Sequence, residues 1–206
     1  MEPEDKILSF LAEPDNIEIA VDVARRIDKL HNHFHAEFWP AVSAELTTRL
    51  DQSPYKNTWM ISEFNRKHRD NWVNIQITYQ LPPNITHTPE ILTITLEQGK
   101  PLDYQLYFGV KWRNHHGRAA NLPEFLTLKE FLRENFYKPK DKLWTIISST
   151  GYSARGDKFL IRMAKERENF IREIVDKPWQ LFLLTVDHLT TINQTTLSKL
   201  QELPSN

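Results

Sequence analysis

The residues best suited to bind an anion form a short basic segment around Trp112. Five residues of this segment carry or can acquire a positive charge, and no carboxylate interrupts them: Lys111, Arg113, His115, His116 and Arg118. Arginine side chains beside an aromatic ring can bind a phosphate backbone or stack on an unpaired base. The segment therefore predicts an exposed positive surface that attracts an anionic partner, either an acidic protein patch or a nucleic acid.

A second cluster of potential ligands consists of His31, His33 and His35. On a helix, the first and last of these residues lie one turn apart on the same face, which is a spacing compatible with a zinc ion. Because His31 lies beside apolar neighbours, the alternative is an imidazole that packs with one nitrogen in water. We favour this alternative and expect no bound metal. A zinc site would need a third ligand from a distant segment: His68, His115 or His116.

Carboxylates near the predicted strands raise a third possibility, a metal-dependent nuclease centre. Such a centre needs carboxylates at the ends of adjacent strands and a lysine that activates water or stabilises charge on the phosphate. No Glu-x-Lys or Asp-x-Lys triplet ends a strand in this sequence. We expect Glu97 and Lys100 to lie in a solvated hairpin turn, assign no catalytic residue and expect no cofactor. The residues available for such a centre are Glu90, Glu97, Lys100, Asp103 and Lys111.

Composition restricts these alternatives further. The chain of 206 residues has no cysteine, which excludes a disulfide framework, a thiolate zinc site and a cysteine nucleophile. It has only 5 glycines and contains neither a G-x-G-x-x-G nor a Walker pattern for binding nucleotide phosphates. The formal net charge is -1, and no apolar segment suits a signal peptide or a membrane helix. We therefore expect a cytoplasmic protein without a membrane partner.

The elements that must position these residues centre on three strands predicted between Trp72 and Trp112. Apolar residues alternate with polar ones in three consecutive segments, over residues 73–79, 92–97 and 104–112. Successive side chains of a strand point to opposite faces, so each segment has one apolar face and one polar face. The pattern predicts an antiparallel sheet that is covered on one face only. Six residues should be buried together on that face: Ile75, Ile77, Leu92, Ile94, Leu106 and Phe108.

Helical periodicity dominates the chain before these strands. A short helix is expected over residues 4–11, and a longer one follows in which apolar residues spaced by three or four form one stripe from Val23 to Leu50. Pro40 lies inside this stripe and either kinks one helix or begins a second one. We therefore expect residues 1–56 to form a helical N-terminal layer against the sheet.

The chain after the three strands adds further helices and one more strand. A helix is expected from Asn121, and a fourth strand over residues 143–148 with Trp144 and Ile146 on one face. Residues 158–176 predict either a strand that leads into a helix or a helix throughout, and a last helix follows Pro178 over residues 179–200. Because strands cluster in the middle and helices at both ends, the fold class is α+β, an antiparallel sheet of about four strands with helices packed on one face. Residues 57–206 form the α+β domain in this division.

The chain from Trp72 to Thr196 resembles the C-terminal accessory region of some bacterial proteins of the PD-(D/E)XK nuclease superfamily. The resemblance rests on the aromatic strand Leu106-Tyr107-Phe108-Gly109-Val110, the step from Leu143 to Trp144, and a long helical segment after residue 170. The catalytic carboxylates and lysine of that superfamily have no counterpart that we can place. The resemblance therefore implies a free-standing relative of an accessory domain, and no catalytic residue is transferred.

Taken together, these patterns favour a non-enzymatic interaction or regulatory protein. The expected partner is a protein or a nucleoprotein, and the resemblance implies a bacterial or phage defence setting. The alternative is a divergent metal-dependent nuclease of PD-(D/E)XK type. The two hypotheses differ in geometry, because a nuclease requires two or three carboxylates that converge with a lysine in one cleft.

Overall fold

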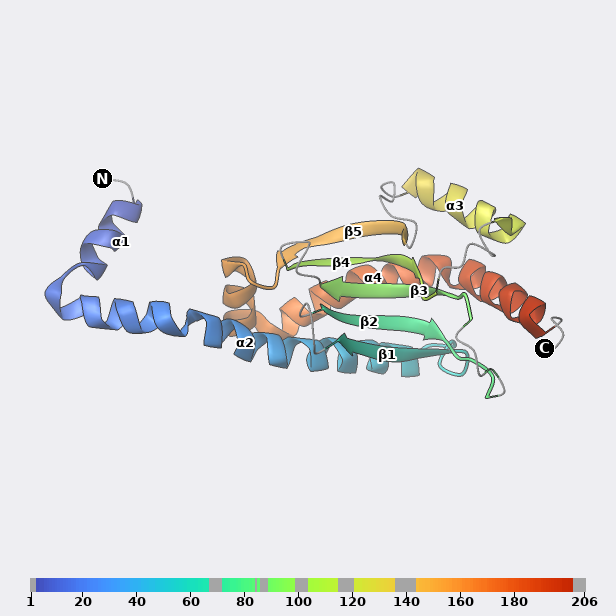
Figure 1. Cartoon of the computed structure of the whole chain (residues 1–206), viewed down its shortest axis with the longest axis horizontal. Coiled ribbons are helices and arrows are strands. Elements are labelled where there is room, and N and C mark those ends of the chain that lie inside the picture. Colours follow the sequence, from blue (N-terminus) through green and yellow to red (C-terminus); the bar gives the residue numbers. More distant parts are fainter. Residues whose placement is uncertain are drawn as a thin grey trace.

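The computed structural model describes residues 3–66, 72–83, 85, 89–98, 104–114, 121–135 and 144–201. Within this part of the chain there are four helices and a five-stranded antiparallel sheet with helices packed against it, so the predicted α+β class is confirmed with one strand more than expected (Figure 1). In chain order the elements are α1 (Pro3–Leu11), α2 (Pro14–Asp51), β1 (Trp59–Arg66), β2 (Trp72–Tyr79), β3 (Leu92–Gln98), β4 (Gln105–Trp112), α3 (Pro123–Asn135), β5 (Trp144–Ser153) and α4 (Asp157–Gln201).

The sheet follows the chain order, β1-β2-β3-β4-β5, and each neighbouring pair is antiparallel. The three strands predicted from alternation are β2, β3 and β4. The additional strand is β1, which pairs with β2 from Trp59 opposite Tyr79 to Arg66 opposite Trp72. Its polar second half hides the strand pattern in the sequence, and pairing along the whole of β2 nevertheless holds it extended.

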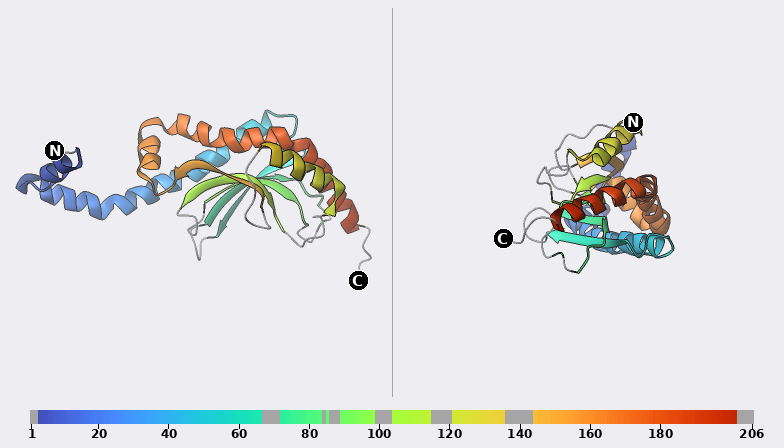
Figure 2. Two further views of the ribbon diagram at one scale, coloured as in Figure 1. Left: turned by 90° about the horizontal axis from the view of Figure 1, so that it is seen from above. Right: turned by 90° about the vertical axis from the view of Figure 1, so that its right-hand side faces the viewer.

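Helices α2 and α4 cover one face of the sheet, and the hydrophobic core lies between these helices and that face (Figure 2). All six residues predicted to share this face are buried in one hydrophobic cluster, so the predicted register is confirmed. Helix α3 packs beside the C-terminal half of α4, where the ring of Phe131 stacks on His188 with centroids 5.6 Å apart. Ring contact between Trp112 and Phe125 joins α3 to the end of β4.

Prolines interrupt neither long helix. Helix α2 continues through Pro40, and α4 continues through Pro178, so the predicted separation at Pro178 is wrong. Proline removes one helical hydrogen bond, but the apolar residues on both sides of it can hold the helix against the core. Here Val175, Trp179 and Phe182 are all buried. The irregular point of α4 lies earlier, at Glu166, where φ is -143° and ψ is 37°.

Strand β3 is buried on both faces, although the sequence predicts one polar and solvated face. All seven of its residues are buried, including Thr93, Thr95 and Glu97 on the face opposite the helices. None of the four helices in the described part of the chain lies on that face, which is the inner side of an arched sheet in Figure 2. Curvature therefore brings side chains of neighbouring strands together over the central strand.

Two local features adapt β4 and β5 to each other. A Cβ atom on Gly109 would lie 2.1 Å from the carbonyl oxygen of Ile146, so only glycine permits this close approach of the strands. The pairing of β4 with β5 then skips Thr145, because Val110 lies opposite Ile146 and Lys111 opposite Trp144. This bulge turns Trp144 to the face opposite Ile146, which corrects the prediction that both share one face.

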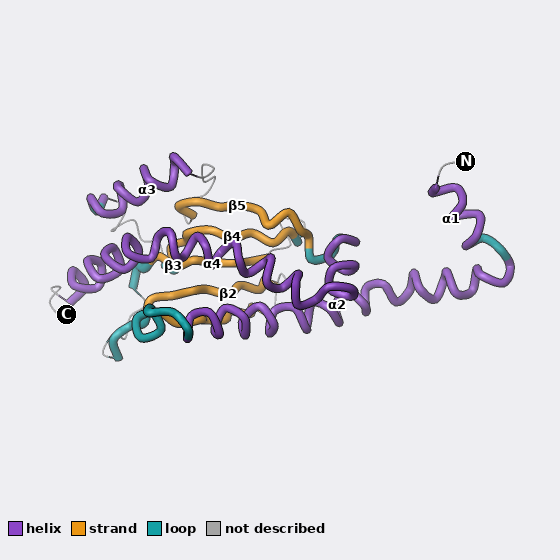
Figure 3. Tube along the Cα trace, turned by 180° about the vertical axis from the view of Figure 1, so that it is seen from behind, coloured by secondary structure: helices purple, strands orange, loops and turns teal. Residues whose placement is uncertain are grey.

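The N-terminal part of the chain projects away from the body of the protein (Figures 1 and 3). We call residues 3–33, which comprise α1 and the first half of α2, the arm. The predicted layer against the sheet is formed only by the second half of α2, where Phe38, Trp39, Val42, Leu46 and Leu50 are buried. Across the described residues, no helix combines the length and the apolar character needed to cross a membrane.

Candidate functional site

The basic segment after β4 is only partly exposed. The ammonium of Lys111 lies 2.6 Å from the carboxylate of Glu97, and the two side chains are only 12% and 2% exposed. The same ammonium lies 4.8 Å from the ring centre of Trp144. Lys111 is therefore a largely covered, paired cation, and its predicted place on an exposed positive surface is wrong. Glu97 is likewise buried in β3, which corrects the prediction that it lies in a solvated turn.

The rest of the predicted positive surface lies at and beyond the end of β4. The side chain of Arg113 is exposed, and its backbone N–H donates to the carbonyl of Ile91 at 2.9 Å. The remaining three members, His115, His116 and Arg118, lie outside the described residues. An exposed anion-binding surface at this point thus stays a prediction for four of the five residues.

The carboxylates proposed for a nuclease centre do not converge where the structure describes them. Glu90 and Glu97 lie at opposite ends of β3, and seven residues of extended chain span roughly 23 Å. Lys100 and Asp103 lie outside the described residues. In the described part of the chain, no three histidine, aspartate or glutamate side chains lie close enough together to hold a metal ion.

The three histidines of the second cluster all lie on α2 but have different surroundings. His33 lies 3.5 Å from Glu37 on the helix surface. His35 points toward the sheet, where the indole N–H of Trp39 donates to its Nε2 at 3.0 Å. The amide oxygen of Gln98 lies 2.9 Å from the same nitrogen and accepts a hydrogen bond from it only when Nε2 carries a proton. His31 and His35 are both partly buried, and His35 is the one that joins α2 to the last residue of β3.

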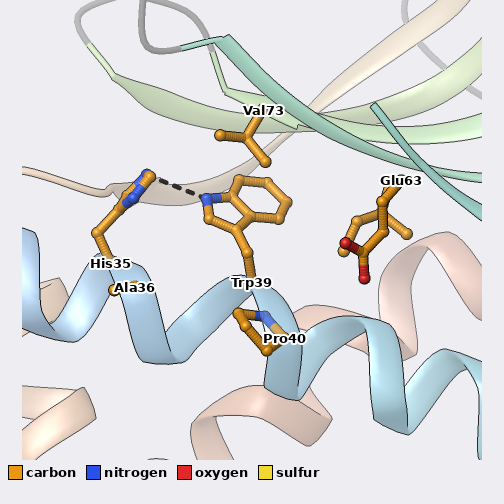
Figure 4. A pocket seen from close by; sticks show the side chains of 7 residues that line it. His35, Ala36, Trp39, Pro40, Glu63 and Val73 are labelled. Carbon is orange, nitrogen blue, oxygen red and sulfur yellow. Dashed lines mark hydrogen bonds between the residues drawn. The ribbon is translucent and has the colours of Figure 1, made fainter. Parts of the chain in front are cut away.

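His35 and Trp39 also line a small pocket between α2 and the edge of the sheet (Figure 4). It has a volume of about 180 Å³. Its walls are mostly apolar, and the carboxylate of Glu63 lies at one side of the labelled residues in Figure 4. The lining residues are His35, Ala36, Trp39, Pro40, Glu63, Val73 and Ile75.

The surroundings of His35 predict a pH dependence of stability. Burial lowers the pKa of His35 below its ordinary value of 6.5, a hydrogen bond to Gln98 opposes this effect, and the positive charge of Arg155 lowers the pKa further. The unfolded chain therefore binds a proton at His35 at a higher pH than the folded chain does. The stabilising contribution is complete above about pH 6.5 and is lost as the pH falls through the folded pKa.

The free energy of unfolding should thus fall more steeply between about pH 7 and pH 5 in the parent than in His35→Gln. Urea denaturation of both proteins at a series of pH values measures this difference. His33→Gln is a suitable control, because that side chain is exposed on the same helix. Parallel curves for the parent and His35→Gln would show that the His35 imidazole binds a proton equally well in the folded and the unfolded chain.

The most unusual surface of the protein is the arm. Nine large apolar side chains of the arm are between 39% and 66% exposed, and they occur on both of its helices. Single exposed apolar residues are common, but this number of them on two successive helices is more than an ordinary surface carries and favours a binding surface. The nine residues are Ile7, Leu8, Phe10, Ile17, Ile19, Val21, Val23, Ile27 and Leu30.

The composition of the arm also disfavours a helix that stands alone in water. Helix α1 has only 9 residues, a length that is marginal without tertiary contacts, and β-branched residues lower the helix propensity of α2. Five β-branched residues occur within eleven positions of α2, so intrinsic propensity does not account for the helix. Packing against another surface would supply the missing stabilisation. These residues are Ile17, Ile19, Val21, Val23 and Ile27.

Charge is distributed unevenly along the arm. Residues 3–22, which we call the tip, contain six acidic residues and one lysine. Residues 23–33, which we call the root, contain three basic residues, one aspartate and two histidines. Where the root joins the body, residues 155–167 carry five basic and two acidic residues, and we call this segment the shoulder. The arm therefore has a negative tip and a positive root, and the root adjoins the positive shoulder.

The shoulder lies beside the part of α2 that directly follows the root. Arg167 forms an ion pair with Glu37 of α2 at 3.0 Å. The positive charge of Arg155 acts on His35, which lies two residues before Glu37 on α2. Sequence periodicity predicts the apolar stripe of α2 correctly, but it assigns the whole stripe to the core and so misses the arm. The signal that could have identified it is the spacing of the stripe, which includes a step of three positions before Phe34 and only steps of four positions after it.

Comparison of this chain with models of known protein families, with curated proteins and with solved structures finds no match. The geometry of the described residues is therefore what bears on its function.

Proposed function

We propose that this protein is a non-enzymatic interaction protein that binds a protein partner through its arm. The observation that carries the proposal is the exposed apolar surface of α1 and the first half of α2, on helices that leave the body (Figure 3). An amphipathic helix that lays its apolar face into a complementary groove is a common mode of protein recognition. In this proposal the α+β body acts as the anchor of the arm.

The connection between arm and body supports this role. Where α2 enters the body, the ring of Phe38 contacts those of Phe159 and Phe170, with centroids 5.1 and 6.0 Å apart. Phe38 has no exposed surface, and α2 continues without a break from Pro14 to Asp51. A continuous helix that is fixed at one end in an aromatic cluster would present its free end in a defined direction.

The chemistry of the arm favours protein over nucleic acid as its partner. Binding to a nucleic acid depends on cations that neutralise phosphates. The tip of the arm carries six acidic residues and one lysine, so it would repel a phosphate backbone. Its apolar side chains instead match the buried centre of protein–protein interfaces, where charged residues are depleted.

Photo-crosslinking in the native host tests the proposal. A photoreactive amino acid in place of Ile27 should give a covalent adduct with another protein chain. The same amino acid in place of Ile161 is the matched control, because Ile161 is 53% exposed on α4 of the body. Introducing Val23→Glu into the Ile27 crosslinking protein should abolish the adduct, since a carboxylate then lies in the apolar surface.

Two outcomes would contradict the proposal. One is the absence of any protein adduct from position 27 and from a second arm position, such as Leu30. The other is an adduct of equal yield from position 161, which would show that crosslinking does not depend on the arm.

A further inference from the structure

We infer that the partner of the arm is a second copy of this chain and that two arms pair antiparallel about a two-fold axis. This inference rests on the proposed function, because it identifies the occupant of the same surface. It draws on three features of the described residues: the spacing of the apolar stripe, the charge along the arm, and the position of the shoulder.

The spacing of the stripe suits pairing with another helix. Val23, Ile27 and Leu30 of the stripe, together with Ala20 just before it, are separated alternately by three and four positions. This is the spacing that forms the seam of a two-stranded coiled coil. Beyond Phe34 the buried residues Phe38, Val42, Leu46 and Leu50 recur every four positions instead, and this part packs on the body. The coiled-coil spacing thus ends where the arm ends.

The charges of the arm are complementary to those of a second copy in the antiparallel orientation only. Antiparallel pairing places the acidic start of α2 in each copy beside the basic shoulder of the other, whereas parallel pairing places tip against tip. Opposite charges across an interface fix the orientation of the partners, and like charges disfavour the alternative. Arg26, which flanks the stripe near the proposed axis, is already paired with Asp22 of its own helix at 3.1 Å.

The length of the arm matches the position of the shoulder. A two-fold axis near residue 25 pairs Val23 with Ile27 and Ala20 with Leu30, which keeps apolar residues opposite each other. The same axis places Asp15 of one chain opposite residue 35 of the other. That level of α2 is where Arg155 and Arg167 of the shoulder lie. The acidic tip of each copy thus reaches the basic shoulder of its partner, which makes the contact self-complementary.

Sedimentation equilibrium over a concentration series tests the inference on the full chain. The parent should show reversible association to twice the mass of one chain. Val23→Glu with Ile27→Glu should weaken the association by about 10-fold or more, because two charges enter the seam. Leu126→Glu is the control, since Leu126 is 47% exposed on α3, and its association should match that of the parent.

Charge reversal tests the antiparallel contact with the shoulder. Arg155→Glu with Arg167→Glu should weaken association, and adding Asp15→Lys with Glu18→Lys should restore it, because the two sets face each other across the axis. A restored association excludes loss of folding as the cause of the first effect. Weakening without restoration would place the shoulder outside the contact and overturn this part of the inference.

Disulfide formation tests the orientation, because the chain has no cysteine of its own. Ala24→Cys lies beside the proposed axis, so oxidation should join two copies at this position. Ala20→Cys lies ten positions from its symmetry mate in the paired register, which is about 15 Å along the helix and too far for a disulfide. Efficient crosslinking of Ala20→Cys to itself would indicate parallel pairing and overturn the inference.

The outcomes separate this inference from the proposed function. A chain that stays monomeric at all concentrations, while position 27 still crosslinks to a different protein, overturns the second copy as partner and leaves the arm as a docking surface. A monomeric chain without any adduct at position 27 overturns both. A covalent adduct at position 27 whose mass is twice that of this chain supports both the proposed function and the second copy as partner.

Discussion

Replacing Lys111 with methionine should lower the free energy of unfolding by about 3–5 kcal/mol, because the variant leaves a buried carboxylate without its partner. Glu97 is 2% exposed and accepts a hydrogen bond from the Lys111 ammonium at 2.6 Å. Removal of the cation therefore leaves the Glu97 carboxylate as an unpaired charge inside the sheet. Urea denaturation should show a lower midpoint with an unchanged m-value.

Two variants make this prediction specific. Arg113→Met removes an exposed cation two residues later and should change stability by no more than about 0.5 kcal/mol. Lys111→Met combined with Glu97→Gln should recover most of the loss, because a neutral amide replaces the unpaired carboxylate. Equal midpoints for Lys111→Met and Arg113→Met would show that solvent reaches Glu97 and that the ion pair contributes little.

Replacing Phe38 with alanine should destabilise the whole body by about 3–5 kcal/mol, because the change leaves a cavity in the aromatic cluster. The ring of Phe38 has no exposed surface and contacts Phe159 and Phe170, which lie on either side of the irregular point of α4. Its loss therefore weakens the attachment of α2 to both parts of α4. Thermal and urea denaturation measure the effect.

Val23→Ala is the matched control for this prediction. Val23 belongs to the same apolar stripe of the same helix but is 58% exposed. In dilute solution, where the chain is monomeric, its replacement should change stability by no more than about 0.5 kcal/mol. A large loss in Val23→Ala under those conditions would mean that the arm packs on its own body, and a small loss in Phe38→Ala would place the body's core elsewhere.

The sequence alone determines the sheet and the face that it buries. Alternation of apolar and polar residues in β2, β3 and β4 is a local property of the chain, and it identifies the shared face of Ile77, Ile94 and Phe108 correctly. The α+β class follows from the order of periodic segments for the same reason. Strand β1 is ambiguous in the sequence, where Trp59 and Ile61 suggest a short strand but the second half is polar, and only pairing with β2 defines it as a strand.

The candidate sites depend on contacts that periodicity does not contain. The charge of Lys111 is evident from the sequence, but its partner Glu97 lies fourteen residues earlier and reaches it only through the antiparallel pairing of β3 with β4. The burial of Glu97 follows from the curvature of the sheet, which an isolated strand pattern does not reveal. The bulge at Thr145 similarly places Trp144 over Lys111 instead of beside Ile146.

The arm shows most clearly how a local sequence pattern differs from burial in the tertiary structure. The sequence determines that α2 is amphipathic from Val23 to Leu50, because spacing by three and four places these side chains on one face. Only the tertiary structure decides which part of that apolar face packs against another element. The sheet and α4 extend along the second half of α2 and end near Glu37, so Phe38 is buried while Val23 remains exposed. The physical reason is that periodicity specifies the direction of a side chain, whereas burial requires a neighbouring element to be present.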